Sequence, residues 1–117
     1  MANILVIEDN ELNLKLMKDI LVSQGYNVET AEDGKAGLDK AENNDYDLIL
    51  LDIQMPVFSG YDFLQTYKKS TPVIVVSACA METEINKAKE LGCKDYISKP
   101  IKINEFLTTI KNHISQI

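Results

Sequence analysis

The sequence has few residues with thiol or imidazole side chains: its 117 residues include two cysteines and one histidine. It also has no tryptophan. Cys79 and Cys93 lack the spacing of a zinc site or a disulfide framework, so we expect small buried or half-buried thiols. His113 falls in the last turns of a predicted helix, where we expect a surface position. Without a second histidine or a reactive cysteine beside it, nucleophilic triads are excluded.

The chain also lacks an excess of positive charge and any long apolar run. Its net charge of −6 argues against direct binding to nucleic acid, which needs a basic patch, and against electrostatic attachment to a membrane. No apolar stretch approaches the ~20 residues that span a bilayer. The first apolar run is short, follows no basic residue and stops at two acids, unlike a signal peptide. We therefore expect a cytoplasmic protein.

Short apolar runs alternate with helical patterns along the whole chain. The runs predict strands over residues 3–8, 26–31, 46–51 and 73–76, and a short fifth strand around residues 96–97. Between them the spacing predicts helices over residues 11–24, from 34 to about 43, after residue 60, and over 82–91. Asn10 and Gly25 are expected to open and close the first helix.

The last helix has an apolar stripe made of Ile103, Phe106 or Leu107, Ile110, Ile114 and Ile117. Alternating strands and helices predict a parallel sheet that helices cover on both faces. The first, third and fourth predicted strands contain continuously apolar runs, at residues 4–7, 48–51 and 73–76, as is typical of strands buried on both faces. The expected fold is a doubly wound α/β unit of the (βα)5 type, a single domain over residues 1–117.

Acidic residues follow two of the apolar runs directly. Glu8 and Asp9 end the first predicted strand, and Asp52 ends the third. Because the carboxyl ends of parallel strands meet at one rim of a sheet, we expect the three carboxylates to converge there. Like charges at close range repel one another, so a cation should hold them together. An oxygen-seeking ion such as Mg²⁺ is the natural candidate.

Two further polar residues also follow directly after predicted strands. Ser77 follows the fourth predicted strand and Lys99 follows the fifth, so five polar residues mark the ends of four strands. With these blocks the chain resembles, over essentially its whole length, the receiver domain of two-component response regulators. The residues that carry the resemblance are Glu8-Asp9, Asp52, Met55-Pro56, Gly60, Ser77-Ala78, Tyr96 and Lys99-Pro100. The resemblance is strongest to regulators without an output domain, and it implies a flavodoxin-like sheet of strand order 2-1-3-4-5.

The resemblance also implies a chemistry. A phosphoryl group would pass from the phosphohistidine of a sensor histidine kinase, or of a histidine phosphotransfer protein, to Asp52. Glu8, Asp9, Asp52 and the backbone carbonyl of Gln54 would hold Mg²⁺, while Lys99 and Ser77 would contact phosphoryl oxygens. In this family the bond before the proline is cis, which implies a cis Lys99-Pro100 bond.

A switch is implied as well. The Ser77 hydroxyl would move toward the phosphoryl group, and Tyr96 would swing inward and change the face made of the fourth helix, fifth strand and fifth helix. That face would bind a downstream protein, from a chain that we expect to be monomeric before phosphorylation. Gln54 and Cys79 occupy positions that flank the path of the hydrolytic water in this family. We expect self-catalysed phosphotransfer and slow autodephosphorylation, and no enzymatic turnover.

Three other functions share some of these features. A haloacid-dehalogenase-type phosphatase also uses an aspartate nucleophile with Mg²⁺, but it needs a second acid where this chain has Gln54. An FMN carrier of the same topology needs a Ser/Thr/Gly-rich phosphate loop after the first strand, where residues 8–11 are mostly acidic. A degenerate receiver that only binds partners is disfavoured by the intact set of five polar residues.

Overall fold

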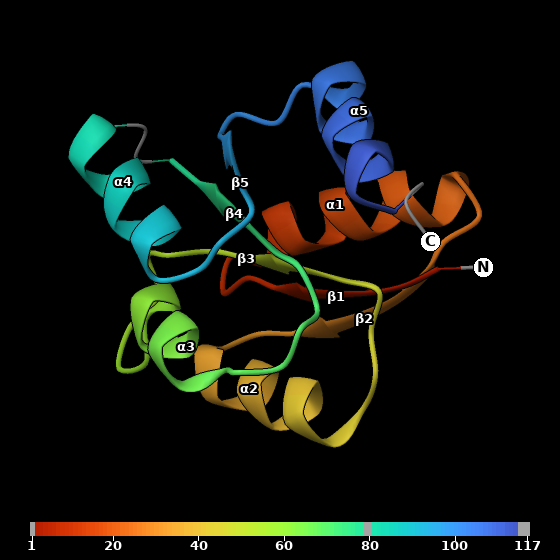
Figure 1. Ribbon diagram of the computed structural model, residues 1–117. Coiled ribbons are helices and arrows are strands. Elements are labelled where there is room, and N and C mark those ends of the chain that lie inside the picture. Colours follow the sequence, from red (N-terminus) through yellow and green to blue (C-terminus); the bar gives the residue numbers. More distant parts are fainter. Residues whose placement is uncertain (1, 79–80, 115–117) are drawn as a thin grey trace.

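The computed structural model describes residues 2–78 and 81–114, and its strands and helices alternate strictly along the chain (Figure 1). The strands are β1 (Asn3–Ile7), β2 (Asn27–Ala31), β3 (Leu48–Leu51), β4 (Val73–Ser77) and β5 (Asp95–Ser98). The helices are α1 (Glu11–Ser23), α2 (Gly34–Asn43), α3 (Gly60–Thr66), α4 (Glu82–Glu90) and α5 (Ile103–Ile114).

The five strands form one parallel sheet in the order β2-β1-β3-β4-β5, which confirms the predicted fold. All residues of β3 and β4 are buried, as expected of central strands that helices cover on both faces. The outer strand β2 alternates between exposed and more buried residues, which is typical of a sheet edge with one wet face. The carboxyl ends of all the strands therefore share one rim.

The sheet separates two apolar cores. Alternate residues of β1 point to opposite sides, so Ile4 and Val6 join one core while Leu5 and Ile7 join the other. The first core contains buried residues of α1 and α5, which cover the same face in Figure 1. The second contains buried residues of α2, α3 and α4, among them Phe63. Both faces of the central strands β3 and β4 are thereby removed from water.

The predicted signals at the ends of α1 are confirmed. The Asn10 side chain accepts a hydrogen bond from the backbone N–H of Asn13 over 3.0 Å, which satisfies one of the free donors of the first turn. Gln24 caps the other end, and Gly25 follows with a φ of 90°, a conformation that favours glycine. The helix therefore begins and ends where local sequence chemistry places it.

Four predicted strand boundaries differ from the structure by one or two residues. β2 begins at Asn27 rather than at residue 26, and β4 ends at Ser77 rather than at residue 76. The third strand begins at Leu48 rather than at residue 46, because Asp47 turns its carboxylate onto the backbone N–H of Asn3, at 2.7 Å. Tyr46 is nevertheless buried, and its hydroxyl donates to Glu29. The first strand ends at Ile7 and not at residue 8, although the backbone N–H of Glu8 still donates to the carbonyl of Ala31.

The helical stripes also differ from the prediction in places. In the predicted fourth helix only Ala88 is fully buried, whereas Ile85 and Leu91 are half-buried. Ile103 is 53% exposed because it begins α5 at the rim, and Ile117 lies outside the described residues. His113 is half-buried rather than on the open surface, with Nε2 3.2 Å from Oδ2 of Asp95.

Candidate functional site

Three carboxylates come together at the carboxyl rim of the sheet. Glu8 follows β1, and Asp52 follows β3, the strand paired with β1. One oxygen from each of Glu8, Asp9 and Asp52 lies within 4.8 Å of the others. Glu8 and Asp52 are buried, whereas Asp9 is exposed at the mouth of the cluster. An ion arriving from solvent would meet Asp9 first and the buried pair behind it.

Lys99 brings a positive charge to this cluster from the end of β5, an outer strand of the same sheet. Its Nζ lies 2.5 Å from Oε1 of Glu8 and 3.6 Å from Oδ2 of Asp52, and the lysine side chain is only 14% exposed. The lysine follows β5, and its backbone N–H donates to the carbonyl of Ser77 over 2.9 Å. The Lys99-Pro100 bond is cis, as the family resemblance implied. In the structure, Lys99 is therefore the cation that pairs with the acids. From the sequence we expected it only to contact a phosphoryl oxygen.

The surroundings of Glu8 raise the pKa of its carboxyl group. Burial raises the pKa of Glu8, and its hydrogen-bonding contact with Asp52 acts in the same direction, while Lys99 opposes both. Its Oε2 accepts a hydrogen bond from the backbone N–H of Asn10 over 3.2 Å. This helix-start contact was missed from sequence, although the sequence Glu8-Asp9-Asn10 before an apolar helix pattern carries the signal. Glu8 is thus held between a lysine and the first turn of α1.

The loop after β3 fixes the carboxylate of Asp52. The backbone N–H of Gln54 donates to Oδ1 of Asp52 over 3.2 Å. Gly60 then brings the start of α3 against the strand end, since a Cβ at this position would lie 2.6 Å from the carbonyl oxygen of Asp52. Between them Val57 has a φ of 67°, which is unusual for a β-branched residue, and its side chain is exposed. The loop is therefore tightly constrained where it borders the acids.

The two predicted switch residues lie on neighbouring strands. Ser77 ends β4 and is fully buried, and it aligns with Ser98 of β5. Tyr96 aligns with Val75, is half-buried and packs against the core beneath α2, α3 and α4. Cys79, the other position named beside the site, lies outside the described residues. β5 thus carries Tyr96 and leads to Lys99 three residues later.

The family model described as the response regulator receiver domain matches residues 4–111 of this chain. The chain belongs to the receiver-domain family. Among curated relatives, the polar-differentiation response regulators DivK of Brucella ovis and Brucella abortus are each 38% identical to this receiver, over 96% of this chain and 95% of their own length. Receiver domains are signalling proteins of two-component systems and not conventional enzymes.

Solved structures of other receiver proteins have the same fold as this chain. The receiver matches the chemotaxis protein CheY4 of Vibrio cholerae with a TM-score of 0.91 and 28% identity, over 96% of this chain and 98% of that one. It matches the receiver domain of the sensor histidine kinase PA1611 of Pseudomonas aeruginosa with a TM-score of 0.88 and 30% identity, over 97% and 98%. That structure holds a magnesium ion coordinated in its active-site cleft. Within the described residues, each helix of the present receiver is too short or too polar to cross a bilayer.

Proposed function

We propose that this receiver accepts a phosphoryl group on Asp52 from a phosphohistidine and passes the signal on as a change of surface. One observation carries the proposal: three carboxylates from two adjacent strands share a rim with the Nζ of Lys99, which contacts both buried acids. An acid cluster alone would support metal binding. A half-buried lysine that contacts the same carboxylates adds a partner for an incoming anion.

The residues fit Mg²⁺ because carboxylate oxygens are the ligands that this ion prefers, and Glu8, Asp9 and Asp52 offer three of them. The backbone carbonyl of Gln54 is the fourth ligand that we propose. When bound, Mg²⁺ would neutralise charge on the acids and on a phosphoryl oxygen. Asp9, at the exposed mouth, would recruit the ion, and Glu8 would hold it from the buried side.

The proposed phosphoryl transfer needs no strong general base. An oxygen of the Asp52 carboxylate would form the new bond to phosphorus while the phosphorus–nitrogen bond of the donor histidine breaks, and the electron pair returns to the imidazole. The carboxylate gives up no proton in this step, so positioning and charge neutralisation are what the protein supplies. Lys99 would transfer its contact from Glu8 to a phosphoryl oxygen, and the hydroxyl of Ser77 would donate to another.

Phosphorylation would change the protein surface through the two strands next to the site, β4 and β5. A phosphoryl group on Asp52 adds about −1.5 to −2 charge. Ser77 would turn toward this charge and Tyr96 would move inward, changing the surface of α4, β5 and α5. The partners that we propose are a sensor histidine kinase or histidine phosphotransfer protein on one side, and a downstream protein on the other. A monomer before phosphorylation, a single domain over residues 1–117 and a cytoplasmic location remain predictions.

The proposal is tested by incubating the protein with Mg²⁺ and acetyl phosphate and measuring its intact mass. We expect one added phosphoryl group in the wild type, none in Asp52→Asn, and none in the wild type with EDTA. Equal labelling of wild type and Asp52→Asn would rule out Asp52 as the acceptor. Hydrolysis of many phosphoesters per molecule would instead favour an Mg²⁺-dependent phosphatase with an aspartate nucleophile, a function that Gln54 argues against.

A further inference from the structure

α4 is attached to the rest of the molecule by few buried side chains. In the helix itself only Ala88 is fully buried, and its N-cap residue, Met81, makes no side-chain hydrogen bond and is 65% exposed. Figure 1 shows α4 at the edge of the molecule, with α3 as its neighbouring helix. Contacts between α3 and α4 therefore help to fix where α4 lies.

Tyr61 of α3 makes two such contacts at once. Its hydroxyl donates a hydrogen bond to the carboxylate of Glu84, and the Nζ of Lys87 lies 4.1 Å from the centroid of its ring. Glu84 and Lys87 are three residues apart, so they share one face of α4. One half-buried tyrosine thus holds an acid through its hydroxyl and a lysine through its ring.

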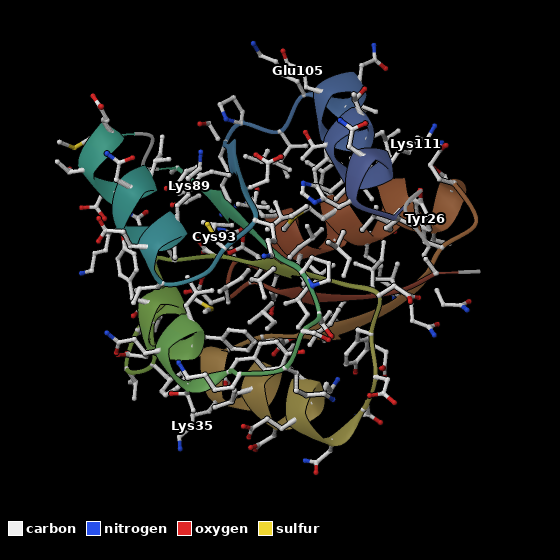
Figure 2. The ribbon with its side chains drawn as sticks, viewed as in Figure 1. Tyr26, Lys35, Lys89, Cys93, Glu105 and Lys111 are labelled. Carbon is white, nitrogen blue, oxygen red and sulfur yellow. The ribbon has the colours of Figure 1, made fainter. Side chains whose placement is uncertain are left out.

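α4 lies between the two proposed switch residues in the chain, so its contacts with Tyr61 bear on the switch. β4 ends at Ser77, α4 follows, and β5 then carries Tyr96, so α4 is the helix that links the two proposed switch residues. In Figure 2, Lys89 and Cys93 mark the end of α4 from which the chain enters β5. Any rearrangement that moves Ser77 and Tyr96 together has to be accommodated by α4.

We propose that Tyr61 is a positioning residue that latches α4 in the arrangement seen without a phosphoryl group, and that this latch opens when Asp52 is phosphorylated. The inference rests on the proposed function for its second half only. The latch opposes switching, because its two contacts are lost as α4 leaves α3. Weakening it lowers the free energy that phosphorylation has to supply.

The size of the effect follows from the contact that Tyr61→Phe removes. A hydrogen bond to a charged acceptor at a partly exposed position shifts an equilibrium by about tenfold. The ring stays in place in this variant, so the contact with Lys87 is kept. Tyr67→Phe is the matched control: Tyr67 lies at the end of the same helix, is buried, and its hydroxyl has no hydrogen-bond partner among the described residues.

The first measurement is amide hydrogen exchange of the protein without phosphodonor. We expect exchange of residues Glu82–Glu90 to be about tenfold faster in Tyr61→Phe than in wild type. Exchange in β1 and α2 should not change, and Tyr67→Phe should exchange like the wild type in α4. Unchanged exchange of α4 in Tyr61→Phe would overturn the latch.

The second measurement is the affinity for beryllium fluoride, a phosphoryl analogue, in saturating Mg²⁺. If the latch opens on switching, Tyr61→Phe binds the analogue about tenfold more tightly, with an unchanged affinity for Mg²⁺ alone. Lys87→Gln should also bind it more tightly. Lys89→Gln, which removes the same charge from another side of α4, should bind it like the wild type.

The outcomes separate the two proposals. Equal affinity of wild type and Tyr61→Phe for beryllium fluoride would show that the latch persists in the switched state, and would overturn its regulatory role. Failure of the wild type and all variants to bind the analogue would instead refute Asp52 as a phosphoryl site. That failure would remove the second half of the inference, while hydrogen exchange would still decide whether Tyr61 holds α4.

Discussion

Glu8 and Asp52 are two buried acids whose strands pair directly, and Lys99 is the cation that contacts both. Two unit charges 4 Å apart interact by about 4 kcal/mol at an effective dielectric constant near 20. The lysine offsets much of this repulsion, but burial and the contact with Asp52 still raise the pKa of Glu8. In the absence of a metal ion, the site is therefore a region of unfavourable electrostatics within a well-packed fold.

Asp52→Asn should accordingly stabilise the protein when no divalent ion is present. The amide keeps the acceptor for the backbone N–H of Gln54 and removes the repulsion with Glu8, while it also loses the attraction to Lys99. We expect a gain of about 1 kcal/mol in the free energy of unfolding in EDTA, measured by urea denaturation. Added Mg²⁺ should stabilise the wild type but have little effect on the variant. A variant less stable than the wild type in EDTA would contradict this electrostatic account.

The strand-end positions of the candidate site residues were predictable from the sequence, whereas most of their contacts were not. Glu8, Asp52, Ser77 and Lys99 all lie at strand ends, because an apolar run that stops at a polar residue is a local signal. The contact between Lys99 and Glu8 joins residues 91 positions apart, and the hydrogen bond between Tyr61 and Glu84 joins residues 23 apart. Neither pair has a local signal, so only the folded chain shows them.

Among the elements, β3, its following loop and α3 form the unit that positions Asp52. The strand and helix were predictable from an apolar run and from the turn sequence that follows it. The start of β3 was not, because the side chain of Asp47 competes for the backbone N–H of Asn3. The exposure of Ile103 was also missed, since helical periodicity does not reveal that the first turn of α5 extends beyond the core.

Gly60→Ala tests how closely α3 sets the position of Asp52. A Cβ there would lie 2.6 Å from the carbonyl oxygen of Asp52, a backbone atom that cannot rotate away. We expect a loss of about 2 kcal/mol in the free energy of unfolding, and an affinity for Mg²⁺ weaker by about tenfold, measured by calorimetry.

Gly92→Ala is the control for this prediction. Gly92 has no neighbour within 4 Å of an added Cβ, but its φ of 112° disfavours alanine. It should lose stability by about 1 kcal/mol and keep its affinity for Mg²⁺. If Gly60→Ala also kept full affinity, the close approach of α3 would have no part in shaping the metal site.

At the scale of the whole molecule, periodicity predicted a sheet that helices cover on both faces, whereas the strand order was predicted from the family resemblance. Residues that make polar contacts between elements add to the stability. Tyr46 is one of these: its hydroxyl lies 2.5 Å from Oε2 of Glu29 in β2. Burial raises the pKa of Tyr46 above its usual value of 10.0, and Glu29 raises it further. The folded protein therefore keeps a proton that the unfolded chain loses near pH 10.

Stability should consequently fall as the pH rises above about 10, since in this range the native state binds more protons than the unfolded state. Tyr46→Phe should remove part of this alkaline decline. Near neutral pH the variant should lose about 1 kcal/mol with the hydrogen bond. Thermal melts between pH 7 and 11 measure both effects. An identical alkaline slope in Tyr46→Phe and wild type would show that Tyr46 does not cause it.

We propose that Asp52, and no other acid of the cluster, takes the phosphoryl group. The most direct measurement is reductive trapping: the protein is treated with Mg²⁺ and acetyl phosphate, reduced with borohydride, and mapped by peptide mass spectrometry. An aspartyl phosphate is reduced to homoserine, so the account predicts homoserine at position 52 and unmodified Glu8 and Asp9. Reduction at Asp9 or Glu8, or an unmodified position 52 in a protein that has gained a phosphoryl group, would contradict it.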